Sequence, residues 1–127
     1  CAPAYKNLGM ALIHREDLDA ADLDAAVRAC KKAIQLEPEL GESYNSLGLV
    51  LNAKGDPEAA IIALRKSIKL NPALAEAYQN LGHAHTKFGD FDSAIKVLRE
   101  GLEINPDSEL LKDALQDLLS RRDNDNS

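Results

Sequence analysis

One short phrase recurs three times in this chain at a fixed interval. Residues 33–38, 67–72 and 101–106 read AIQLEP, SIKLNP and GLEINP, so that Pro38, Pro72 and Pro106 are 34 residues apart. Proline lacks a backbone donor and clashes with the preceding helical turn, so each phrase is typical of a helix that ends at its proline. A period of this length indicates a stacked-repeat architecture.

Two blocks, residues 41–74 and 75–108, align closely on these prolines. Their matched pairs are Tyr44 and Tyr78, Leu47 and Leu81, Gly48 and Gly82, Gly55 and Gly89, Asp56 and Asp90, Ala60 and Ala94, and Leu64 and Leu98. A glycine followed by aspartate predicts a helix end and the cap of the next helix, so each block is predicted to be a helical hairpin. Gly48 and Gly82 fall within the first helices, where we expect the partner helix to cross with Ala60 and Ala94 facing them.

The two ends of the chain vary this pattern. The first block, about residues 2–40, has five extra residues around 14–21 and no glycine at its turn, and Asp22 is predicted to cap its second helix. After Pro106, an apolar stripe predicts a capping helix over about 108–122, which covers the open end of the stack. We therefore expect one domain over residues 1–122 and a disordered tail over 123–127.

The repeat resembles the tetratricopeptide repeat (TPR) family. The matching residues are Tyr44, Leu47, Gly48, Leu51, Ala60, Leu64 and Pro72, and then Tyr78, Leu81, Gly82, Ala94, Leu98 and Pro106. Three residues depart from the family pattern: His85 stands where an aromatic is commoner, and Ser67 and Gly101 stand where alanine is usual. The resemblance implies an all-α fold, a right-handed superhelical α-solenoid of helix-turn-helix hairpins.

The resemblance also implies a function, the binding of an extended peptide or helix of a partner protein in the concave groove. By the family pattern, the groove residues are Lys6, Asn7, Met10, Glu42, Asn45, Ser46, Leu49, Asn52, Glu76, Gln79, Asn80, His83 and Lys87. Several are amides, which can donate to and accept from a ligand backbone, as a similar asparagine ladder does in enzymes that attach N-acetylglucosamine. Asn7, Asn45, Asn80 and His83 are the first candidates. The alternative is that these are ordinary polar residues on a solvent-exposed surface and have no role in binding a ligand.

One family ligand is not expected here. Co-chaperone TPR domains hold the C-terminal carboxylate of heat-shock chaperones with two asparagines and three basic residues. The matching positions carry Lys6, Met10, Ser46, Glu76 and Asn80, of which only Lys6 fits, and Glu76 would repel a carboxylate. We expect no chaperone-tail clamp.

Composition argues against several other classes of function. A net charge of −6 disfavours nucleic acid as a partner, and no apolar run is long enough for membrane insertion. The acidic stretch from Asp17 to Asp24 lacks the glycine and the final glutamate of a calcium-binding loop. His83 and His85 lie on different faces of a helix and so cannot share a metal ion without distortion. Without a catalytic, metal or cofactor constellation, we expect binding rather than enzyme activity.

Two alternatives to groove binding remain open. The chain could be an assembly module that uses its convex face or its N-terminal end, where Tyr5, Leu8 and Leu12 would support a homodimer. It could also be the recognition arm of a larger enzyme.

Cys30 falls on an apolar stripe and is predicted to be an inert core residue. The cytoplasm is the default location, with lipid attachment through Cys1 as the alternative.

Overall fold

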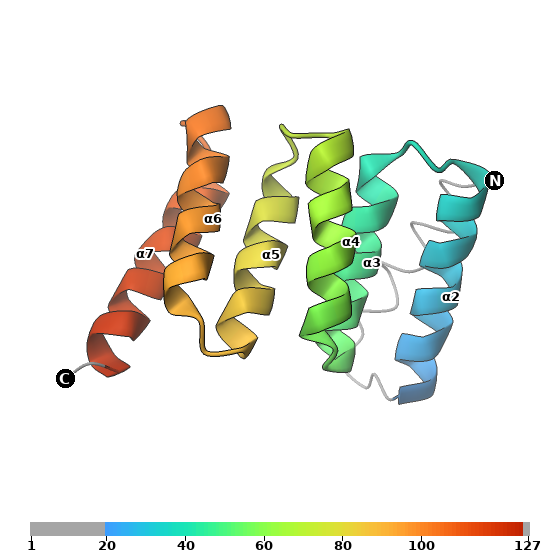
Figure 1. The fold of residues 1–127 in the computed structure, drawn as a ribbon, viewed down its shortest axis with the longest axis horizontal. Helices are drawn as coiled ribbons and strands as arrows, with labels where there is room; N and C mark the ends of the chain where they lie inside the picture. The colour runs from blue at the N-terminus through green and yellow to red at the C-terminus, as the bar shows by residue number, and fades with distance from the viewer. Residues whose placement is uncertain (1–19, 126–127) are drawn as a thin grey trace.

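The structure is a computed structural model that describes residues 20–125, and all regular structure within that range is helical (Figure 1). The helices are α2 (Ala20–Leu36), α3 (Gly41–Lys54), α4 (Pro57–Leu70), α5 (Ala75–Lys87), α6 (Phe91–Ile104) and α7 (Glu109–Asp125). The two aligned blocks are the hairpins α3–α4 and α5–α6, as the repeat predicts. The first helix expected in the first block falls in residues 1–19, outside the described part.

The helices form two layers with different packing. In the inner layer α3 contacts α5, and α5 contacts α7. In the outer layer, among the described helices, α4 contacts neither α2 nor α6, although each outer helix packs on its inner neighbours. Figure 1 shows the helices standing side by side in chain order. Because hairpins approach closely on one side only, the stack curves with α3, α5 and α7 on its concave face.

The turn within each hairpin follows the chemistry predicted from its glycine and aspartate. Gly55 has φ of 89°, in the left-handed region, and its N–H donates to the Asn52 carbonyl while the Asp56 N–H donates to the Leu51 carbonyl. Asp56 Oδ1 then accepts the Ala59 N–H at 3.2 Å, which caps α4. The α5–α6 turn repeats these roles with Gly89, Thr86, Asp90, His85 and Ser93.

Two departures from the family pattern are explained by contacts between the two helices of one hairpin. The Ser67 hydroxyl, at the end of α4, donates to the Gly41 carbonyl at 2.8 Å, where alanine could offer no bond. Gly101 makes room for an aromatic ring, since a Cβ there would lie 2.7 Å from Tyr78 Cγ. The Tyr78 hydroxyl in turn donates to the Pro72 carbonyl at 2.8 Å, fixing the hairpin connection. Alanine would lack the hydroxyl that Ser67 uses, and at Gly101 its Cβ would overlap the Tyr78 ring.

The core consists of two groups of buried apolar residues that meet at α4. One joins α4 to α7 around Leu64, Leu98 and Leu111, and the other joins α2 to α4 around Cys30 and Val50. Cys30 is fully buried, as predicted, and burial raises the pKa of its thiol to about 11. The thiol therefore stays protonated at neutral pH, which suits a packing residue.

The structure corrects two helix boundaries. Asp22 lies in the first turn of α2 and not at its cap, because the helix already begins at Ala20. The last helix runs through Asp125, so residues 123–125 are helical where a disordered tail was predicted. The end of α7 is held by contacts to α6, since Arg122 pairs with Asp92 at 3.9 Å and the Arg121 guanidinium lies 5.9 Å from the Phe91 ring centroid.

The first experimental test concerns the two glycines at the helix crossings. A Cβ at Gly48 would overlap Leu64 Cγ and lie 2.5 Å from its Cδ2, whereas a Cβ at Gly82 would lie 3.4 Å from Leu98 Cγ. Alanine gains about 1 kcal/mol of helix propensity at either site, but overpacking costs about 1–3 kcal/mol.

We therefore expect Gly48→Ala to lower the free energy of unfolding by about 1 kcal/mol or more and Gly82→Ala to leave it unchanged or raise it. Urea denaturation of the two variants checks this. Equal effects at both sites would show that the crossing at Gly48 is not tighter than that at Gly82.

Candidate functional site

The inner layer carries the sequence-predicted groove residues that the structure describes. They come from α3 and α5, while Lys6, Asn7 and Met10 lie outside the described residues. Their exposure divides them into three groups. The buried ones are Asn45, Ser46, Asn52 and Asn80, the half-buried ones are Glu42, Leu49 and Gln79, and the exposed ones are Glu76, His83 and Lys87.

The buried amides bond across the inner layer. Asn80 Nδ2 on α5 donates to Asn45 Oδ1 on α3 at 2.8 Å, and Asn52 Nδ2 donates to the Asn80 carbonyl at 3.0 Å. Lys87 Nζ completes the set by donating to the Asn52 carbonyl. Only 6% of Asn45 and 8% of Asn80 are exposed, so these side chains join α3 to α5. Their contact with a ligand stays a prediction, and Gln79 and His83 are the more accessible candidates.

A hollow of about 160 Å³ lies beside those accessible residues, between α5 and α7. Gln79, His83 and Thr86 line it from α5, and Asp117 and Arg121, which pair at 3.8 Å, line it from α7. Burial, followed by the positive charges of Lys87 and Arg121, lowers the pKa of His83. A neutral imidazole at this position can both donate and accept a hydrogen bond.

Sequence reasoning did not place α7 or Thr86 in this groove. The capping helix was predicted only to cover the open end of the stack, although α7 takes the place that the first helix of another hairpin would occupy. Thr86 aligns with Asn52, a predicted groove residue, and this alignment was the signal that could have identified it.

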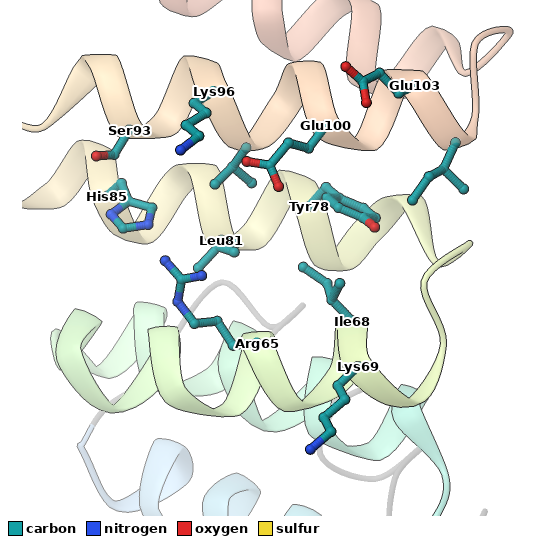
Figure 2. A pocket seen from close by; sticks show the side chains of 12 residues that line it. Arg65, Ile68, Lys69, Tyr78, Leu81, His85, Ser93, Lys96, Glu100 and Glu103 are labelled. Carbon is teal, nitrogen blue, oxygen red and sulfur yellow. The ribbon is translucent and has the colours of Figure 1, made fainter.

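A larger hollow of about 480 Å³ opens on the outer layer between α4 and α6, with α5 as its floor (Figure 2). Arg65 lines it from α4, His85 from α5 and Lys96 from α6. Burial, then the Arg65 charge, lowers the pKa of His85, and Asp90 opposes that effect. The sequence analysis did not predict this hollow. The residue that could have indicated it is His85, because the family usually has an aromatic residue at that position.

No group of three or more histidine, cysteine, aspartate or glutamate side chains within residues 20–125 is arranged to hold a metal ion. None of the helices described there combines the length and the apolar character that a membrane span requires.

The repeat assignment agrees with comparisons of sequence families. A tetratricopeptide repeat profile matches residues 51–118, and a second tetratricopeptide repeat profile matches residues 15–75. The chain belongs to the tetratricopeptide repeat family. Its repeats place it among protein-interaction modules in general. No curated protein sequence matches the chain.

Solved structures show the same fold. The Sgt2 TPR domain from Aspergillus fumigatus is 19% identical, with a TM-score of 0.83 over 98% of this chain and 81% of that one. The O-GlcNAc transferase of Thermobaculum terrenum is 26% identical, with a TM-score of 0.76 over 93% of this chain but 22% of that one. MamA protein is 33% identical, with a TM-score of 0.71 over 83% of this chain and 55% of that one. The predicted all-α TPR solenoid is thereby confirmed.

The buried amide pair allows a direct stability test. Replacing Asn80 with alanine leaves buried Asn45 Oδ1 without its donor, which costs about 1–3 kcal/mol of unfolding free energy. The adjacent, half-buried Gln79→Ala is the matched control and should change stability by about 0.5 kcal/mol or less. Urea denaturation measures both. Equal effects would show that the Asn45–Asn80 bond adds no measurable stability.

His85 makes folding stability depend on pH in a defined direction. Its pKa in the folded chain lies below the ordinary histidine value of about 6.5, so the unfolded chain binds a proton first as pH falls. The groups around it are Arg65 from α4, Asp90 from the turn, and Lys96 from α6. Stability is therefore complete above pH 6.5 and declines as pH falls toward the lowered pKa.

We expect His85→Leu, which places the residue of the preceding repeat here, to flatten that decline. Thermal unfolding measured between about pH 7.5 and 5.5, the range around a histidine pKa, checks this. An unchanged pH profile in the variant would assign the decline to other groups.

Proposed function

We propose that the inner face of α3, α5 and α7 binds an extended segment of a partner protein. The observation that carries the proposal is the hollow between α5 and α7, which adjoins the accessible Gln79 and His83. The fixed α3–α5 amide bonds support it, because a groove whose helices are already joined loses less freedom when a ligand binds. The chain's contribution on this reading is binding and not catalysis.

Solved relatives of the fold support a peptide as the ligand. The first TPR domain of Spaghetti (RPAP3) was solved with the HSP90 peptide SRMEEVD, and it matches this chain with a TM-score of 0.79 at 17% identity. An identity this low carries over the fold alone, so the choice of ligand rests on the residues of this chain.

Those residues favour the middle of a segment over its C-terminal carboxylate. Glu76 is exposed at the start of α5 and would repel a terminal carboxylate. The Gln79 amide can donate to and accept from the ligand backbone, which suits recognition of an extended chain. Half-buried Leu49 offers an apolar contact on α3, and the hollow beside His83 accommodates a side chain.

The test starts from peptides selected by display on the wild-type chain. We expect the double variant Gln79→Ala/His83→Ala to bind a selected peptide roughly tenfold or more weakly, because it removes both accessible polar contacts. Arg99→Ala, which changes an exposed residue of the outer helix α6, is the matched control and should bind normally. Isothermal titration measures all three.

The peptide SRMEEVD serves as the second arm of this experiment. We expect no saturable binding of it by the wild-type chain, since only one clamp position fits and Glu76 opposes the carboxylate. Tight binding of that peptide would overturn the exclusion of a terminal carboxylate. Loss of binding in Arg99→Ala, with the double variant unaffected, would move the interface to the outer layer.

A further inference from the structure

The outer layer has two hollows that occupy equivalent places in successive repeats. The first, of about 550 Å³, lies between α2 and α4, and the second, of about 480 Å³, lies between α4 and α6. Tyr44 and Leu47 in the first are replaced 34 residues later by Tyr78 and Leu81 in the second. The repeat therefore builds the same recess twice, over the same kind of floor.

The walls of the two recesses differ in chemistry. The first carries Leu51 and Ile62, and Ile62 is 70% exposed. The second carries His85 and Lys96 at the matching positions. The first recess also carries Lys31, Lys54 and Lys66, so the contrast is confined to these two matched positions, where apolar side chains fit the same frame and packing does not require polar ones. Their presence in the second recess needs another reason.

The polar residues of the second recess converge without a partner. His85 Nε2 is buried and has no hydrogen-bond partner among residues 20–125. Arg65 and Lys96 point toward His85 from opposite walls (Figure 2), and neither forms an ion pair with a described residue. A buried polar atom left unpaired costs about 1–3 kcal/mol, so an acceptor that meets Nε2 after the His85 side chain shifts toward the recess would be stabilised.

The charges in the second recess are unevenly distributed. Arg65, His85 and Lys96 gather at one end, over the Leu81 side of the floor (Figure 2). Glu100 lies one helical turn further along α6, and Glu103 follows it toward the other end. A ligand with a single carboxylate at the His85 end would meet three donors. A ligand with a long run of negative charge would also reach the two glutamates, which would repel it.

We propose that this outer recess binds an acidic side chain of a partner protein, with its carboxylate between Arg65, His85 and Lys96 and a neighbouring apolar side chain over Leu81 and Tyr78. The guanidinium of Arg65 offers a fork that matches a carboxylate, and His85 Nε2–H and Lys96 Nζ supply further donors. Nucleic acid and anionic membrane surfaces fit less well, because of Glu100, Glu103 and the net charge of −6. The site lies on the opposite layer from the inner groove and does not depend on it.

The test uses the full chain and a capped peptide of alternating glutamate and leucine, with a glutamine-for-glutamate peptide as the uncharged control. Isothermal titration gives the affinity, and the NMR signals of the His85 ring report its position. We expect saturable binding of the acidic peptide, with shifts at His85, and at least roughly tenfold weaker binding of the glutamine peptide.

Variants taken from the preceding repeat localise the site. Lys96→Ile, which copies Ile62, should weaken binding roughly tenfold, since it removes one charged donor and keeps the packing of the equivalent wall. Glu100→Gln should strengthen binding, because it removes a negative charge from the α6 wall of the recess, and this opposite sign separates a charge effect from loss of folding. Lys31→Ala, the counterpart of Arg65 in the first recess, should leave binding unchanged.

Five results would each overturn the proposal. The first four are the absence of saturable binding, equal affinity for the glutamine peptide, equal weakening by Lys31→Ala and Lys96→Ile, and loss of binding in the inner-face variant Gln79→Ala/His83→Ala. The fourth result would place the peptide in the inner groove. The fifth, an affinity for inorganic phosphate equal to that for the peptide, would reject the assignment to a protein side chain.

Discussion

Close packing between the two helices of a hairpin sets the dimensions of the whole solenoid. At Gly48 the absence of a Cβ lets Leu64 lie directly on the α3 backbone, and Gly82 and Leu98 meet in the same way, with more space, in the next hairpin. Each leucine is fully or almost fully buried, so a change in this spacing would open the core. The spacing within a hairpin also determines where the neighbouring helices pack. It therefore determines the shape of both recesses on the outer layer.

The inner layer depends on hydrogen bonds where the hairpins depend on apolar packing. The Asn80–Asn45 bond and the Asn52–Asn80 bond connect α3 to α5 in a region with few large apolar side chains. These bonds favour one alignment of the two helices, because a shift along the helix axis would leave the Asn52 and Asn80 amide donors buried and unpaired. The same polar residues that make a groove hydrophilic therefore also fix its shape.

Much of the fold could be predicted because helix ends depend on local chemistry. Gly55, Asp56 and Pro72 act within a few residues of their own positions, and the structure confirms the turns they predict. The Asn45–Asn80 bond could not be foreseen, since it joins residues 35 positions apart and depends on how two helices align. The extent of α7 was missed for a similar reason, because the Arg122–Asp92 contact comes from a different helix.

The asymmetry between the layers gives the solenoid a preferred direction of bending. Among the described helices, those of the outer layer pack closely on the inner helices and not on one another, so tighter curvature separates helices whose backbones are already apart. Opening the inner face would instead break the bonds between α3 and α5. Bending toward tighter curvature should therefore meet less resistance than flattening, and because α4 forms a wall of both outer recesses, such bending would change the shape of both.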